Sequence, residues 1–303
     1  MRSSTHEFDT DHPPTRMRAR GTRRPAILRL LGQDRPAACA AGLLLLLVLA
    51  AVVAARLTGY AYDHQDLDHP FRGPEAGRWW LGTDQYGRDL LTRVLYGARV
   101  SLAVGSSAVA AESVVGVAWG TIAGFYGGRL DAALMRVVDL LIAFPSLLLA
   151  VLVTGIFGAS LVNIVLALTM TAWPGMARTI RSEVVALRER DYLEAARGLG
   201  ASPARILARH LIPNVVHLLG ARATLDVSAL ILNEATLSFI GIGVQPPRPS
   251  WGLMISESFQ FLQSHPYLVV VPATALSVTV VSFNLLGETL SEWLDPKLRQ
   301  RTR

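Results

Sequence analysis

The chain has 303 residues, of which 51% are hydrophobic and 17% are charged, and its mean hydropathy is +0.36. Soluble proteins carry about 25% charged residues. The charges are also unevenly placed, because six apolar stretches that total 145 residues hold only ten of the 52 charged side chains. Charged side chains are costly near the centre of a bilayer. The composition therefore excludes an ordinary soluble domain and predicts an all-α polytopic membrane protein.

Two residue counts exclude further classes of site. The chain has one cysteine, Cys39, which excludes internal disulfides and cysteine-based metal centres. Its single lysine, Lys297, follows a proline, whereas a phosphate-binding P-loop needs a Gly-Lys-Ser/Thr sequence. We therefore expect no catalytic residue, no metal site and no ATP-binding site in this chain. The net charge of +6 comes from arginines in loops that follow a membrane-topology rule, so we expect no nucleic-acid partner.

The six apolar stretches are each long enough to cross a bilayer, because about 20 residues of α-helix extend about 30 Å. The first is too long for the apolar core of a cleaved signal peptide, so we expect it to remain as a helix. Residues 1–35 and 291–303 are then tails, and the first tail is basic and predicted to be partly disordered. The six predicted transmembrane helices cover residues 36–57, 98–124, 132–155, 159–178, 214–240 and 266–290.

The basic residues also predict an orientation. With the N-terminus inside, the cytoplasmic segments hold 21 Lys and Arg residues and the external segments hold five. Such a bias matches the excess of positive charge on the cytoplasmic side of membrane proteins. Both termini are therefore predicted to be cytoplasmic. Residues 58–97 form an external loop with a helix that leads into the second span, and residues 181–213 form a cytoplasmic loop.

The external loop ends in the motif LGTDQYGRDLLTR. Thr83 or Asp84 is placed to cap the next helix, and i,i+4 spacing predicts ion pairs from Asp84 to Arg88 and from Asp89 to Arg93. One interpretation is a self-paired surface helix on the membrane. The other is that these charges shape an outer gate or meet a substrate-binding protein. The candidate residues of this motif are Gly82, Thr83, Asp84, Gly87, Arg88 and Asp89.

Several polar side chains interrupt the predicted spans. Arg136 and Asp139, like Arg222 and Asp226, are spaced so that each pair can neutralise itself within one helix. Glu112 has no such partner nearby in sequence, so it must face a polar path, contact a partner chain or become protonated. The candidates for lining a polar path through the membrane are Glu112, Asn233 and Glu234.

Three prolines also fall inside predicted spans. Pro145, Pro174 and Pro272 each remove a backbone hydrogen bond, which predicts a kink in the third, fourth and sixth spans. Kinked helices either give a bundle two arrangements or simply shape its packing.

The cytoplasmic loop 181–213 reads as two helices with a break. Residues 187–199 are strong helix formers, and Gly200 follows them as a stop signal. Ser202 and Pro203 then suit the start of a second helix, which Pro213 is predicted to end. Leu193, Ala196 and Leu199 or Gly200 are predicted to share one face of the first helix, and its small alanines would let a partner approach closely. The loop either docks on such a partner or packs as an amphipathic helix on its own membrane domain.

The residues of this loop resemble the EAA motif of binding-protein-dependent ABC importer permeases. The matching positions are Glu194, Ala195, Ala196, Gly200 and Pro213, and His210 replaces the aliphatic residue usual three positions before the proline. Further motifs, including LGTDQYGRDLLTR, GFYGGRLDAALMRVVD and LSFIGIGVQPPRPSWGLM, resemble the C-type permeases of dipeptide, oligopeptide and nickel transporters. This resemblance covers roughly residues 36–300.

The resemblance implies a type I importer permease in a bacterial cell membrane, with the EAA loop as the element that couples it to an ATPase. It also implies four kinds of partner: a second, B-type permease that completes the pathway, two ATPase subunits that bind ATP and Mg, an external solute-binding protein, and lipid. The same scaffold imports peptides, nickel or other small solutes. A secondary transporter or an intramembrane enzyme is the alternative from another class. However, the chain lacks internal repeats and the HExxH and GxSxG motifs.

Overall fold

The structure, a computed structural model, describes residues 34–294 apart from the side chains at 55, 217 and 218. The predicted tails 1–35 and 291–303 lie largely outside these residues. The predicted all-α class is confirmed, because the described residues form helices and no strand. The helices are α2 (Arg35–Val52), α3 (Ala54–Thr58), α4 (Leu90–Tyr126), α5 (Gly128–Ala143), α6 (Ser146–Phe157), α7 (Leu161–Arg188), α8 (Asp191–Gly198), α9 (Pro203–Ile206), the π-helix η1 (Leu207–Leu211), α10 (Ile212–Ile240), α11 (Trp251–Ser258), the 3₁₀-helix η2 (Phe259–Phe261) and α12 (Tyr267–Leu294).

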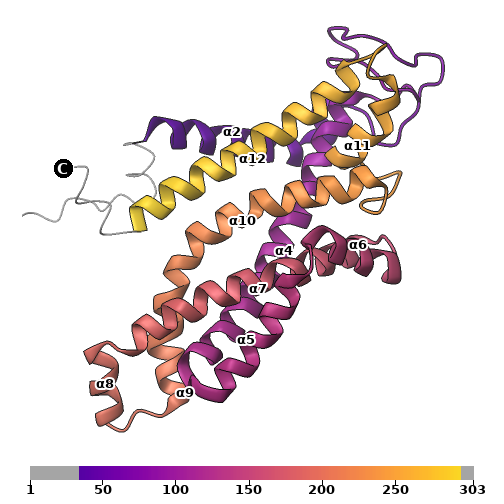
Figure 1. Ribbon diagram of the computed structural model, residues 1–303. Coiled ribbons are helices and arrows are strands. Elements are labelled where there is room, and N and C mark those ends of the chain that lie inside the picture. The colour runs from indigo at the N-terminus through magenta and orange to yellow at the C-terminus, as the bar shows by residue number, and fades with distance from the viewer. Residues whose placement is uncertain (1–33, 295–303) are drawn as a thin grey trace, which may run out of the picture.

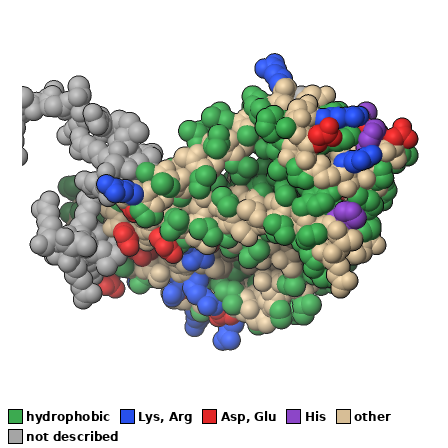
Figure 2. All heavy atoms as spheres, turned by 90° about the horizontal axis from the view of Figure 1, so that it is seen from above, with side chains coloured by type: hydrophobic (Ala, Val, Ile, Leu, Met, Phe, Trp, Pro, Cys, Tyr) green, Lys and Arg blue, Asp and Glu red, His purple; other side chains and the backbone are tan. Residues whose placement is uncertain are grey.

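Four helices of the described chain, α2, α4, α10 and α12, are long and apolar enough to cross a membrane, and the bent pair α5–α6 makes up to five. The predicted span 159–178 overlaps the first part of α7, which is long enough but less apolar, since it includes Asn163, Pro174 and Arg178. A crossing by α7 therefore stays a prediction. Apolar side chains cover most of the middle of the face in Figure 2, and charged side chains gather at its margins, as expected for a bundle in lipid.

Three glycines produce the closest contact between long helices. Gly116, Gly120 and Gly124 recur every four residues on α4 and face α7. A Cβ atom at Gly120 would lie 2.4 Å from the carbonyl oxygen of Ala177, and Cβ atoms at the other two glycines would also collide with α7. Small residues at this spacing allow two membrane helices to pack with their backbones close together. These three glycines, here called the glycine seam, therefore let the backbones of α4 and α7 pack closely together.

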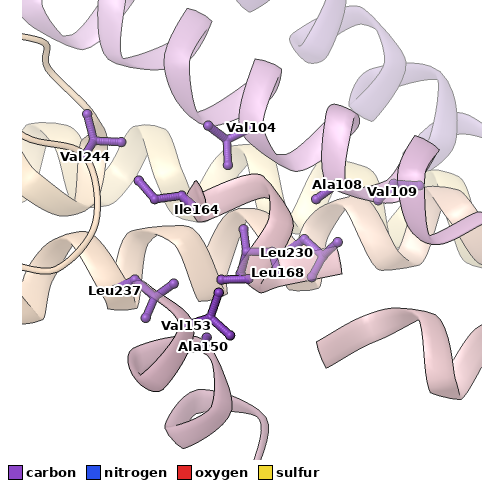
Figure 3. Packing of buried hydrophobic residues seen from close by; sticks show 11 residues of the cluster. Val104, Ala108, Val109, Ala150, Val153, Ile164, Leu168, Leu230, Leu237 and Val244 are labelled. Atoms are coloured by element: carbon purple, nitrogen blue, oxygen red, sulfur yellow. The ribbon is translucent and has the colours of Figure 1, made fainter. Parts of the chain in front are cut away.

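The largest buried cluster lies between four helices, α4, α6, α7 and α10 (Figure 3). It is made of aliphatic side chains, and many of its members are almost completely inaccessible. Because lipid is as apolar as these side chains, close packing rather than exclusion from water stabilises such a contact. The labelled members in Figure 3 are Val104, Ala108, Val109, Ala150, Val153, Ile164, Leu168, Leu230, Leu237 and Val244.

The third predicted span is not one straight helix. α5 and α6 meet at an angle of 88°, and Figure 1 shows α6 turning aside from the end of α5. Pro145 explains the break, because a proline disfavours helical backbone at the preceding residue, and Phe144 is extended with ψ of 135°. Here the predicted kink is a full break. Pro174 and Pro272, in contrast, lie inside the continuous helices α7 and α12.

The two ends of the bundle carry different structures (Figure 1). One end, here called the coupling end, holds α8 and α9. The other, here called the loop end, holds the segment 59–89, which packs over α11, η2 and the start of α12. There, the hydroxyl group of Tyr267 donates hydrogen bonds to the carbonyl oxygens of Thr83 and Arg72, at 3.0 and 3.2 Å. The segment is therefore a packed cap rather than a loose connection.

Candidate functional site

At the coupling end, α8 is held to the bundle by one side chain. Leu193 is fully buried, in a cluster with Ile180 and Val184 of α7 and Ile206 and Leu211 of the next helical segment. No side chain caps the N-terminus of α8, so this apolar contact positions the helix. The cluster ties α8 to α7 and α10, the two long helices on either side of the loop.

The opposite face of α8 is open. Glu194 and Ala195 are exposed, Ala196 is half-buried, and Leu199 is 89% exposed. Among the exposed large apolar side chains of the described residues, that of Leu199 is the most exposed. The helix α8 thus has one face anchored by Leu193 and one face exposed.

Gly200 ends α8 in a Schellman motif. Its φ is +79°, its backbone N–H donates to the carbonyl oxygen of Arg197 at 2.9 Å, and that of Ala201 donates to Ala196 at 3.0 Å. This left-handed conformation is one that residues with a Cβ atom rarely adopt. No heavy atom lies within 4 Å of a Cβ built at Gly200, so backbone conformation, and not crowding, accounts for glycine here.

The second helix of the pair begins as predicted, because Ser202 accepts a hydrogen bond from the backbone N–H of Arg205 and Pro203 occupies the first turn. Its predicted end is wrong. Pro213 does not stop the helix, which continues through η1 into α10. The π-helical turn explains this, because its wider hydrogen bonds, such as that from the Ile212 N–H to the Leu207 carbonyl, accommodate a residue that lacks an N–H. The second helix of the pair is therefore joined to α10 without a break.

At the loop end, the motif 81–93 forms a buried ion cluster. Nε of Arg88 lies 2.6 Å from Oδ2 of Asp84, as the i,i+4 spacing predicted. The guanidinium groups of Arg88 and Arg93 both bond Oε2 of Glu257 in α11, at 3.2 and 2.9 Å. The side chains of Asp84, Arg88 and Arg93 are at most 6% exposed, so the surface-helix interpretation is wrong. The cluster instead joins the start of α4 to α11.

Asp89 has a different role from the one predicted. It does not pair with Arg93, and it caps α4 by accepting bonds from the N–H and hydroxyl groups of Thr92, at 2.7 and 2.5 Å. This cap starts α4 at residue 90, eight residues before the predicted span, and neither Thr83 nor Asp84 caps it. Burial raises the pKa of the Asp89 carboxyl, while the hydrogen bonds from Thr92 oppose that shift.

The remaining residues of the motif shape the turn that carries the cluster. The hydroxyl group of Thr83 donates to the carbonyl oxygen of His69 at 2.8 Å and accepts from the N–H of Arg72 at 2.9 Å. Gly82 and Gly87 have φ of +88° and +68°, and any Cβ atom there would collide with the backbone of the 66–72 segment. The motif therefore packs closely against the 66–72 segment and holds it at the loop end of the bundle.

Inside the bundle, the predicted pair of Arg222 and Asp226 is present, with Nε and Oδ2 at 2.8 Å. Glu112 lies on α4 beside this pair, and it is only 1% exposed, with no partner for Oε1 among the described residues. The other predicted self-pair is wrong, because Asp139 bonds Arg178 of α7 at 2.7 Å and not Arg136. It is the close approach of α5 and α7 that brings those two charges together.

Asn233 and Glu234, adjacent in sequence, have different surroundings. Glu234 is fully buried, and its two oxygens accept hydrogen bonds from the hydroxyl groups of Ser101 and Ser238, at 2.9 and 2.7 Å. This carboxyl group joins α4 to α10 and does not reach an open surface. Asn233 is half-buried and lines a small cavity with Ser146 and Thr171.

Two features of the site escaped the sequence analysis. Glu257 is the acidic partner of both arginines in the loop-end ion cluster, yet it lies more than 160 positions away, and its sequence context carries no signal of that contact. The glycine seam on α4, in contrast, has a readable signal in the spacing G-x-x-x-G-x-x-x-G of residues 116–124. In the described residues no group of three His, Cys, Asp or Glu side chains could hold a metal ion.

Comparison with known proteins shows which family this chain resembles in sequence and fold. Residues 116–300 match the family described as binding-protein-dependent transport system inner membrane component. The chain is 40% identical to the dipeptide transport system permease protein DppC of Alkalihalophilus pseudofirmus, over 83% of each chain. It is 38% identical to the oligopeptide permease OppC of Bacillus subtilis, over 85% of this chain and 84% of the relative.

Two further similarities extend the comparison. The glutathione transport system permease protein GsiD of Pectobacterium atrosepticum is 39% identical, over 86% of this chain and 87% of the relative. Among solved structures, an inward-facing conformation of the MetNI methionine ABC transporter superposes with a TM-score of 0.55 at 19% identity. That match covers 67% of this chain and 96% of the MetNI chain. It supports the predicted type I importer fold.

Proposed function

Because the chain belongs to the family of binding-protein-dependent transport system inner membrane components, we propose that it forms half of a peptide pathway driven by separate ATPase subunits. The chain is a permease subunit of an ABC importer and a component of the inner membrane. It is a transport subunit and not a catalyst, and its setting implies ATPase and substrate-binding partners.

The observation that carries the coupling role is the two-sided construction of α8. Its buried Leu193 fixes the helix to α7 and α10, while Glu194, Ala195 and Leu199 face outward. In the proposal, a groove of the ATPase receives this outer face. When ATP draws two ATPase subunits together, the pair α8–α9 moves with them, and the continuous helix from Pro203 to Ile240 carries that movement into the bundle.

The proposal includes the finer assignments that the sequence suggested. The ATP and Mg are bound by the ATPase subunits, and a second permease of B type completes the pathway. Both termini and α8 are cytoplasmic, so the loop end faces the solute-binding protein. There the loop-end ion cluster would hold α11 against α4 as part of an outer gate. In the proposal, Glu112, with an unpartnered Oε1, and Asn233 line the path, whereas Glu234, whose two oxygens are both hydrogen-bonded, joins α4 to α10.

The substrate class rests on the relatives, which transport dipeptides, oligopeptides and glutathione according to their names. We therefore favour short peptides over nickel or another small solute. In the different-class alternative, a self-contained transporter, this chain alone would move solute without ATP.

The test is purification from mild detergent followed by identification of bound proteins by mass. The proposal expects a second permease and P-loop ATPases with the wild-type chain and with a Leu166→Ala variant, which alters an exposed residue of α7. It expects loss of the ATPases, with the second permease retained, for Leu199→Asp. Recovery of the chain alone, able to transport in vesicles without ATP, would contradict the proposal.

A further inference from the structure

A row of polar and small side chains follows one side of α10 through an otherwise apolar helix. Arg222, Asp226, Ala229 and Asn233 recur at steps of four, three and four residues, which places them along one face. All but Arg222 and Asp226 are uncharged, and these two lie inside the apolar segment Leu219–Ile240 that is long enough to cross a membrane. The row is called the α10 polar stripe below.

The α10 polar stripe reaches the surface of the chain. The side chain of Arg222 is 45% exposed, that of Asp226 is 16% exposed, and Ala229 is also exposed. Charged side chains at this depth are strongly disfavoured in contact with lipid and occur where they face a bundle interior or a water-filled cavity. The stripe therefore faces water or a partner subunit and not the hydrocarbon of the bilayer.

Glu112 places a second carboxyl group behind the stripe, beside Asp226 and Arg222. It lies at the centre of the predicted span 98–124, and the charged groups acting on it are Asp226 and Arg222. Two carboxyl groups thus share one guanidinium group, and that guanidinium already bonds Asp226. Oε1 of Glu112 is buried without a hydrogen-bond partner. A buried carboxylate oxygen without a donor is costly, so a cation or donor bound at this place would be stabilised.

The surroundings extend the site along the same path. Arg222 Nη2 lies 3.9 Å from the position of a Cβ at Gly175 of α7, so glycine leaves room beside the charges. Farther along, Asn233 of the stripe lines the small cavity shared with Thr171 of α7 and Ser146 of α6. A row of polar side chains thus runs between α10, α7 and the start of α6, with the carboxyl groups of Glu112 and Asp226 along it.

We propose that Glu112 and Asp226 form a site within the pathway that binds the ammonium group of a passing substrate, with Arg222 holding Asp226 in place. This inference rests on the proposed function, because it assumes that the α10 polar stripe lines the route of transport. An ammonium group supplies a positive charge and N–H donors to the Glu112 carboxyl group, whose Oε1 has no hydrogen-bond partner in the described residues. The side chain of Arg222 is 45% exposed, so the site is open on that side, which suits a substrate that must leave again.

The test measures the charge and water access of the stripe through a single introduced cysteine. Ala229→Cys is made in a Cys39→Ala chain within the complete transporter, and its reaction rate is compared for a cationic ethylammonium and an anionic ethylsulfonate methanethiosulfonate. The inference expects both reagents to react, with the cationic one faster by on the order of tenfold. A Leu46→Cys variant, altered at a residue that is 65% exposed on α2, is the control for a lipid-facing position and should react with neither reagent.

Two variants then test the assignment of the charge. Asp226→Asn and Glu112→Gln should each reduce the preference for the cationic reagent several-fold, whereas Asp139→Asn, which removes an exposed carboxylate of another ion pair, should leave it unchanged. A failure of the Ala229→Cys thiol to react would overturn the inference. So would a preference that Glu112→Gln leaves intact, because Glu112 would then be permanently neutral.

A transport measurement separates this inference from the proposed function. With one binding protein and one dipeptide, ATP-driven uptake should fall for Asp226→Asn and stay near the wild-type rate for Asp139→Asn. Normal uptake by Asp226→Asn would refute the ammonium site and leave the importer assignment standing. Absence of ATP-driven uptake by the wild-type chain would refute the proposed function, whatever the labelling shows.

Discussion

Two leucines test the proposed coupling role of α8, because one holds the helix in place and the other is exposed to a partner. They are Leu193 within α8 and Leu199 at its C-terminal end. Leu193 is fully buried between α7 and the helix that continues into α10, and Leu199 is 89% exposed. Truncation of Leu193 to alanine leaves a cavity in a packed cluster, and such changes cost about 2–5 kcal/mol. Truncation of Leu199 removes no contact within the chain, so its effect on the chain's own stability is within about 0.5 kcal/mol.

The expected results follow from these magnitudes. A cost of about 2–5 kcal/mol exceeds what a short helix without a side-chain cap can supply, so Leu193→Ala should release α8 locally and leave the long helices folded. Hydrogen exchange across residues 189–201 should accelerate by more than tenfold. Leu199→Ala should leave that exchange unchanged but weaken binding of the ATPase.

The assay combines hydrogen exchange with ATPase activity stimulated by the loaded binding protein, both measured on the assembled transporter in lipid. Both variants should lose stimulated hydrolysis, for different reasons that the exchange data separate. The reasoning would be refuted if Leu193→Ala left exchange at α8 unchanged, or if Leu199→Ala loosened α8 as much as Leu193→Ala did.

Further predictions concern glycine and cap positions. Gly120→Val should lower the thermal unfolding temperature in detergent, because its side chain collides with α7 at a cost of about 1–3 kcal/mol; Gly42→Val, with no atom within 4 Å, should not. Gly200→Ala should destabilise the end of α8 by about 1–2 kcal/mol because of its positive φ, whereas Gly198→Ala should not, and hydrogen exchange would distinguish them. The pKa of Asp89 is raised on folding, so its destabilising effect is present at neutral pH and is relieved as the pH falls through the folded pKa toward the ordinary value of about 4. In a pH series of unfolding temperatures, Asp89→Asn should lack this acid stabilisation, and an unchanged series would contradict the assignment.

The sequence predicted the fold class well because a bilayer imposes a strong and local rule. Each apolar stretch had to be helical, since unpaired backbone groups are not tolerated in lipid. The start of α9 was also predictable, because Ser202 and Pro203 act on their own turn. Such local rules failed where two segments compete or meet. Asp89 could pair with Arg93 or cap the helix through Thr92, and it caps the helix. Pro213 does not end its helix, because a π-helical turn precedes it.

The ion pairs between different helices could not be predicted from the sequence. Asp139 pairs with Arg178 only because α5 packs on α7, and Glu257 reaches Arg93 only because α11 folds back onto α4. The face of α8 was predicted incorrectly, because Leu193 was grouped with Leu199 or Gly200, whereas Leu193 is buried and Leu199 is exposed. The tertiary contact of Leu193 determines which face is buried.

The most direct test of the account is peptide uptake by the reconstituted transporter. Proteoliposomes would contain this chain, its partner permease and both ATPases, with a dipeptide supplied by the binding protein. The account predicts accumulation that requires ATP and the binding protein together and that is abolished by Leu199→Asp. Accumulation that persists without ATP, or that is unaffected by Leu199→Asp, would contradict it.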